Sequence, residues 1–152
     1  MKVELKLQPG LEEPKVVIFA GAESEQLRQL AEHLAKLDLA PIPALDGERT
    51  MLLQREDILR FYADGKGVCA QTTQGTYPVR LRLYELEERM DGHTFVRISN
   101  SEIINLKKIT ALDLKLSGTI RIALEGGVVT YTSRRYVKKI KEALGLGKGE
   151  KP

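Results

Sequence analysis

The chain has 152 residues, which suits one modest domain with an appendage and is too few for two full domains. A single cysteine excludes an internal disulfide. No apolar run is long enough to span a membrane, and we expect neither a secretory signal nor a membrane anchor. A soluble, cytoplasmic protein is therefore expected.

The net charge of +3 is unevenly distributed along the chain. Residues 1–46 carry five basic and eight acidic side chains, whereas residues 47–152 carry nineteen basic and thirteen acidic ones. Five of the eight residues from 134 to 141 are Arg or Lys, and further basic residues lie upstream between 107 and 121. Such a basic excess indicates an anionic polymer as the partner.

The N-terminal segment is predicted to form two strands and a helix. Residues 2–7 alternate apolar and charged side chains, as a strand does when one side faces a core, and the run 15–20 predicts a second strand. Apolar residues on one helical face predict a helix over 23–39. Prolines and turn residues place the end of this β-β-α extension near 41–47. Since two strands cannot cover the helix's apolar stripe, we expect residues 1–46 to dimerise or bind a partner.

From residue 47 the sequence is typical of short antiparallel strands joined by turns, with a short helix over 82–90. A final helix over 133–145 is predicted to begin at Ser133 and to end at Gly145. Residues 146–152 form a polar, glycine-rich tail that we expect to be flexible. The domain over 47–145 is therefore predicted to be mainly β, with its core including Tyr84, Leu86 and Phe95. The predicted strands cover 50–53, 58–63, 68–72, 76–79, 94–98, 103–105, 109–116, 119–124 and 128–132.

The final helix carries two arginines, Arg134 and Arg135, in its predicted first turn, where the helix dipole disfavours positive charge. A bound phosphate would relieve this conflict, because a helix N-terminus and guanidinium groups both attract it. A solvated basic face is the alternative interpretation.

Few residues are suited to catalysis. The two histidines, His33 and His93, form no metal-ligand pattern with Cys69, which is expected to be a small buried apolar residue. The turn after the run 15–20 lacks the glycine pattern of a nucleotide-binding loop. We therefore predict neither an enzyme nor a metal, cofactor or small-molecule ligand.

Three blocks in order resemble the LytTR-type DNA-binding domain of bacterial transcription regulators. They are 52–62 (LLQREDILRFY), 83–109 (LYELEERMDGHTFVRISNSEIINLKKI) and 133–145 (SRRYVKKIKEALG). The resemblance covers about two-thirds of the chain. Residues 1–46 do not resemble a phosphoacceptor receiver domain, so the chain is more similar to the short stand-alone members of the family.

The resemblance implies an elongated, mainly β, antiparallel fold whose loops enter successive major grooves of DNA. Three segments are implied as contacts: the turn 64–67, the tripeptide 99–101 and the start of the final helix. Asn can pair with adenine N6 and N7, and Arg with guanine O6 and N7. The implied base contacts are therefore Asn100, Arg135 and Lys66, and the implied backbone contacts are Ser99, Ser101, Arg134 and Lys138.

Two positions depart from the family pattern, which commonly has His at Ser99 and Arg or Lys at Asn100. A different base preference is therefore expected, and Asn100 could instead be a simple turn residue. Arg97 is interpreted as an outward residue or one half of an internal ion pair.

The leading prediction is a sequence-specific regulator that binds double-stranded DNA as a homodimer on repeated half-sites. The alternative is a protein interaction module in which a LytTR-like fold has lost DNA binding. An RNA or single-strand binder is disfavoured because only 5% of residues are aromatic, which leaves little surface for base stacking.

Overall fold

A computed structural model describes residues 1–36, 40–115 and 118–146. The chain divides into two compact units, Met1–Leu37 and Asp38–Pro152. The predicted flexible tail lies outside the described residues from 147 onward.

The first unit contains one helix, α1 (Glu25–Lys36), whose start is capped by Ser24 Oγ accepting from Leu27 N at 3.2 Å. The predicted helix is confirmed over this span, and its expected last residues, 37–39, lie outside the described residues. The two predicted strands are wrong, because residues 1–24 form no strand in this chain. Two short isolated strands gain too little hydrogen bonding and burial to offset their loss of conformational entropy.

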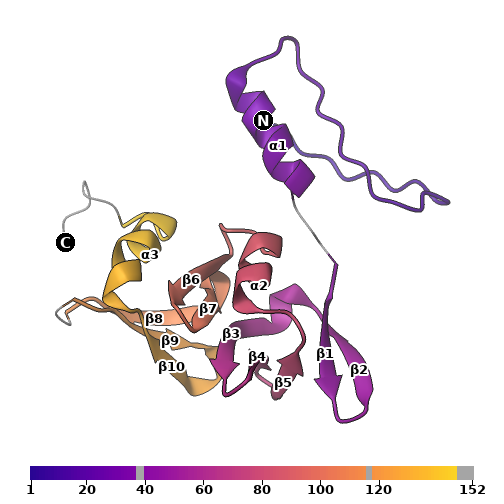
Figure 1. Ribbon diagram of the computed structural model, residues 1–152. Coiled ribbons are helices and arrows are strands. Elements are labelled where there is room, and N and C mark those ends of the chain that lie inside the picture. The colour runs from indigo at the N-terminus through magenta and orange to yellow at the C-terminus, as the bar shows by residue number, and fades with distance from the viewer. Residues whose placement is uncertain (37–39, 116–117, 147–152) are drawn as a thin grey trace. The chain divides into compact units, whose positions relative to one another are not determined.

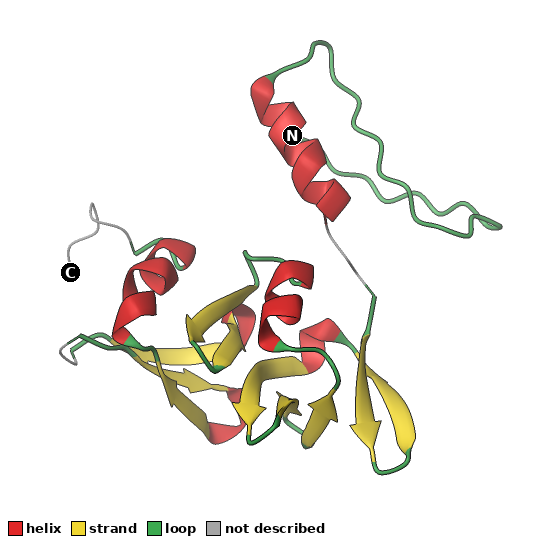
Figure 2. Ribbon diagram, viewed as in Figure 1, coloured by secondary structure: helices red, strands yellow, loops and turns green. Residues whose placement is uncertain are grey.

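The strands among the described residues of the second unit form three antiparallel sheets, and Figures 1 and 2 show how these strands are arranged. The two-stranded sheet pairs β1 with β2, the five-stranded sheet has the order β5-β4-β3-β7-β6, and the three-stranded sheet has the order β10-β9-β8. The mainly β, antiparallel prediction with a C-terminal helix is thereby confirmed. The elements are β1 (Ile42–Asp46), β2 (Arg49–Leu53), β3 (Ile58–Asp64), β4 (Gly67–Thr72), β5 (Thr76–Val79), α2 (Leu83–Arg89), β6 (Phe95–Ser99), β7 (Glu102–Asn105), β8 (Ile109–Asp113), β9 (Arg121–Leu124), β10 (Val128–Tyr131) and α3 (Val137–Ala143).

Strand β1 was not predicted, because Pro41 and Pro43 indicated a boundary between the extension and the domain at these residues. The strand pairs with β2 around a turn at Gly47, whose φ of +63° favours glycine. Pro43 fits because β1 is an edge strand and lacks a second neighbour. The boundary between the two units lies after Leu37, upstream of the boundary that the sequence predicted at 41–47.

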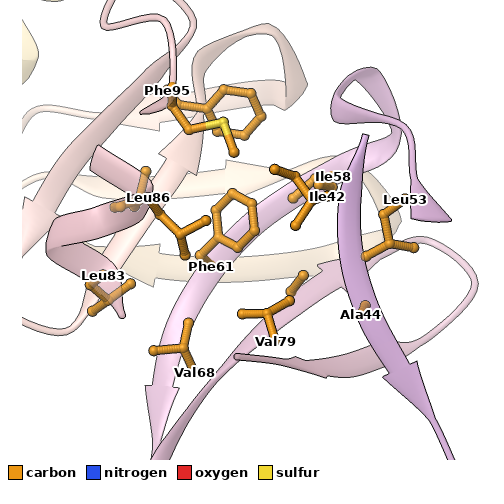
Figure 3. Close-up of a cluster of buried hydrophobic side chains, with 13 residues drawn as sticks. Ile42, Ala44, Leu53, Ile58, Phe61, Val68, Val79, Leu83, Leu86 and Phe95 are labelled. Atoms are coloured by element: carbon orange, nitrogen blue, oxygen red, sulfur yellow. The ribbon is translucent and has the colours of Figure 1, made fainter. Parts of the chain in front are cut away.

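The five-stranded sheet buries a hydrophobic cluster on each of its faces. Phe61 on β3 lies in the first cluster with Ile42, Leu86 and Phe95, as Figure 3 shows, and its ring centroid is 5.9 Å from that of Phe95. Leu59, two residues before Phe61, belongs to the second cluster, because a register shift between Ile58 and Arg60 interrupts the strand's alternation. The second cluster joins the five-stranded sheet to the three-stranded sheet and to Ile140 of α3. Tyr84, predicted to be core, is instead 57% exposed on α2.

Candidate nucleic-acid interface

The first predicted contact segment is the tight turn between β3 and β4. Asp64 pairs with Gly67, so Gly65 and Lys66 form a two-residue connection. Gly65 has φ +60° while Lys66 has a negative φ, as in hairpin turns with glycine at the first central position. This geometry leaves Lys66 exposed at the end of the hairpin.

The second segment is the turn between β6 and β7, which lies beside the end of β3. The backbone N–H of Ala63 donates to the carbonyl of Ser101 at 2.9 Å, and Tyr62 pairs with Glu102. Within the turn, Ser99 Oγ accepts from the N–H of Ser101 at 3.2 Å. The first two contact segments therefore leave the same end of the five-stranded sheet.

The guanidinium group of Arg97 stabilises the turn through hydrogen bonds to its backbone. Its Nε donates to the carbonyl of Ser99 at 2.7 Å, and its Nη2 donates to the carbonyl of Asn100 at 2.6 Å. Its Nη1 lies 3.6 Å from Glu87 on α2. A planar guanidinium group can make these contacts together because its donors form a fixed fork. The internal ion pair considered for Arg97 is thus confirmed, but its two bonds to the turn were not foreseen.

The start of the final helical region lies against the same turn. The N–H of Ser133 donates to the carbonyl of Ile98 at 2.8 Å, and the hydroxyl of Tyr136 donates to Oδ1 of Asn100 at 3.3 Å. Neither Tyr136 nor its contact with Asn100 was foreseen from the sequence. A single aromatic residue close to a helix start has no sequence pattern that identifies a partner 36 residues away.

The predicted cap at Ser133 is wrong in detail. Residues Arg134–Tyr136 form a 3-10 turn, and the α-helix starts only at Val137. The Ser133 hydroxyl makes no capping bond and is buried without a hydrogen-bond partner among the described residues, while its carbonyl accepts from Tyr136 N. The two arginines therefore precede the α-helix, and the helix-dipole conflict inferred from the sequence is reduced. The predicted end at Gly145 is confirmed, with φ +75° and a bond from Leu146 N to the Lys141 carbonyl.

The basic side chains of this region differ in their surroundings. Arg134 packs along the backbone at Gly118, where a Cβ atom would lie 3.0 Å from Nε of the arginine. Arg135 is exposed, with its guanidinium carbon 6.0 Å from the Tyr136 ring centroid. Lys138 is exposed on the first turn of α3, after the 3-10 turn that carries the two arginines.

A buried polar network supports the base of the turn. Glu102 accepts a hydrogen bond from Thr130 Oγ1 at 2.8 Å and forms an ion pair with Arg60 at 3.1 Å. Arg60 also donates to Gln71 at 2.6 Å and lies 4.5 Å from the ring centroid of Tyr62. The network joins β3, β4 and β7 to β10, so it fixes the end of the sheet that carries the two turns.

Burial raises the pKa of the Cys69 thiol, and the nearby Asp64 carboxylate raises it further. The residue is half-buried rather than fully buried as predicted.

Within the described ranges, no helix has the length and apolar character needed to cross a membrane.

Comparison with known proteins places this geometry in a family. Residues 48–145 match the family described as the LytTr DNA-binding domain. The fold is similar to the LytTr DNA-binding domain of a Bacillus cereus protein, with a TM-score of 0.67 and 18% identity over 70% of this chain and 97% of that one.

Similar full-length relatives come from Staphylococcus aureus. Proteins of strains NCTC 8325 and MRSA252 are 34% and 33% identical over 96% of this chain and 99% of their own length, and both are named uncharacterized HTH-type transcriptional regulators. The similarity includes the first unit as well as the second. Within the described ranges of our structure, no two α-helices are consecutive, so the helix-turn-helix name has no counterpart there. The chain belongs to the LytTR DNA-binding domain family.

Proposed function

We propose that this protein is a transcription regulator that binds double-stranded DNA with sequence specificity. One observation carries the proposal: hydrogen bonds link the β3–β4 hairpin, the turn at Asn100 and the start of the final helical region into a single surface. The family described as DNA-binding and the relatives named transcriptional regulators support the same conclusion. We propose a binding role in the cytoplasm rather than a catalytic one.

Asn100 and Arg135 are the proposed base-reading residues, with Lys66 as a third. The Tyr136 hydroxyl occupies one lone pair of Asn100 Oδ1, which leaves the amide N–H groups able to donate to a base. Arg135 is exposed next to Tyr136 in the sequence and is proposed to bind guanine O6 and N7 in a major groove. Ser101, Arg134 and Lys138 are proposed to bind phosphates, and Ser99 is proposed to act there while its hydroxyl also shapes the turn.

We further infer that two protomers act together on repeated half-sites, with the first unit as the element that brings them together or binds a partner. The family relatives span both units, so the extension accompanies the DNA-binding domain in them. Two linked domains raise the local concentration of the second after the first has bound.

The test is a fluorescence anisotropy titration with a duplex selected by the protein from a random pool, repeated at several salt concentrations. We expect specific binding whose log affinity falls with log salt at about −0.9 per phosphate contact. Arg135→Ala is expected to cost about 1–3 kcal/mol and to relax discrimination at one base pair, whereas Lys138→Ala should weaken all duplexes about equally.

The alternative, an interaction module without DNA binding, makes a different prediction in the same experiment. It requires that no duplex be enriched from the pool and that Arg135→Ala leave the weak residual binding unchanged. That result would contradict the proposed function.

A further inference from the structure

The opening segment of the first unit is an extended chain with two different sides. Lys2 and Lys6 both pair with Glu4, at 3.1 Å and 3.8 Å, so these three charged residues lie together. The alternating residues Val3, Leu5 and Leu7 are 82%, 89% and 87% exposed. The segment thus has the side-chain pattern of a strand but forms no strand with any described part of its own chain.

The sequence of this segment is complementary to itself. In an antiparallel pair centred on Leu5, Val3 faces Leu7 of the other strand, Glu4 faces Lys6, and Lys2 faces Gln8. The three apolar pairs, Val3–Leu7 twice and Leu5–Leu5 once, fall on one face, and the two Glu4–Lys6 pairs fall on the other. Opposite charges directly across a pair of strands are stabilising, and a two-fold axis creates the Glu4–Lys6 pair twice.

We propose that residues 2–8 pair antiparallel with the same residues of a second copy of this chain. The exposed backbone N–H and C=O groups would then be satisfied by the partner strand, since an unpaired strand edge is a template for another chain. The same unit has further apolar surface that could cover the side of the strand pair carrying Val3, Leu5 and Leu7. This surface consists of Phe19, which is 94% exposed, and the half-buried leucines of α1. The charge pattern selects an identical partner over an unrelated protein, because the match arises from one sequence read in both directions.

Charge reversal tests both the partner and the register. Full-length protein is measured by sedimentation equilibrium at low salt and without DNA. Glu4→Lys or Lys6→Glu each replaces two attractive pairs by two repulsive ones, and we expect the dimer Kd to rise roughly 4- to 30-fold. The double variant E4K/K6E restores complementarity and should return to the wild-type Kd. An equimolar mixture of the two single variants should form heterodimers for the same reason.

Glu12→Lys is the matched control, because it makes the same charge change on an exposed residue outside the paired segment. It should leave the Kd unchanged. A wild-type protein that stays monomeric at tens of micromolar, or a double variant as weak as the single ones, would overturn the proposal.

A cross-link provides a second test that does not depend on salt. Residues facing each other in an antiparallel pair have Cα atoms about 4.5–5.5 Å apart, which suits a disulfide. In a Cys69→Ser background, Leu5→Cys should therefore oxidise rapidly to a covalent dimer, and Leu11→Cys should not. Equal rates for the two would contradict the pairing.

These measurements contain no DNA, so their outcome is separate from that of the proposed DNA-binding function.

Discussion

The two units of this chain contain similar apolar patterns but use them differently. In the second unit, the alternating residues Val68 and Ala70 of β4 are buried in the first cluster, and Ile122 and Leu124 of β9 are buried in the second. In the first unit, an equally regular alternation at residues 2–7 is exposed. Alternation therefore specifies which side of a strand is apolar, whereas burial requires a neighbouring strand and a layer that covers the apolar face.

The sharpest test of this contrast compares two phenylalanines. Phe61→Ala should destabilise the second unit by about 3–5 kcal/mol, because the side chain is fully buried. Phe19→Ala should change that stability by less than about 0.5 kcal/mol. All five tyrosines lie in the second unit and the chain has no tryptophan, so urea unfolding followed by tyrosine fluorescence measures this unit alone. Equal effects of the two variants would contradict the different burial of the two side chains.

A smaller difference is expected between two glutamates with ion-pair partners. Glu102→Ala leaves Arg60 and Thr130 without their buried acceptor and should cost about 2–4 kcal/mol. Glu4→Ala removes two exposed pairs in the first unit and should change the stability of the second unit by less than about 0.5 kcal/mol. The same urea titration measures the stability of both variants. Glu102→Gln keeps one acceptor, so its loss of stability should lie between those of the two alanine variants. A cost below about 1 kcal/mol for Glu102→Ala would mean that the network is not stabilising.

A third comparison between the two units uses an arginine from each and measures DNA binding. Arg97→Lys keeps the charge but loses the fork that holds the carbonyls of Ser99 and Asn100, so we expect about a 10-fold loss of affinity for the selected duplex, or ~1.4 kcal/mol. Discrimination at the base nearest Asn100 should fall, while binding to random duplex should stay the same. Arg28→Lys makes the same change on α1 and should alter neither value. Unchanged discrimination in Arg97→Lys would argue against its role in positioning the turn.

The smallest effect concerns thiol chemistry. Because the pKa of the Cys69 thiol is raised, its thiolate fraction at pH 8 is below that of an exposed cysteine, and its alkylation should be slower. The reference is a cysteine placed at Leu11 in a Cys69→Ser background. The rate at Cys69 should rise at higher pH and match the reference in urea. Equal rates in the folded proteins would show that Asp64 and burial do not affect this thiol.

The sequence alone determined the class of the second unit and most of its elements. Periodicity of two and glycine-containing turns predicted nine of its strands within a few residues, and apolar spacing predicted α2 and the final helix. The motifs in order were sufficient to indicate the family, since they lie in continuous stretches. The three predicted contact segments came from the resemblance to the family, and each lies at a local turn or helix start, which the sequence could locate.

Other features depended on residues that are distant along the chain. Strand β1 exists because β2 pairs with it and because Ile42 and Ala44 fill the first cluster, which no local rule for Pro41 and Pro43 could indicate. The bond between Tyr136 and Asn100 joins two residues that have no pattern in common.

The same reason explains the error in the first unit. Residues 2–7 alternate apolar and charged side chains as a strand does, but a strand forms only when another strand supplies hydrogen bonds along its edge. Local sequence determines which conformations a segment favours, and tertiary structure decides which of them acquire partners, because the free energy of pairing and burial comes from residues elsewhere in the chain or in a second copy.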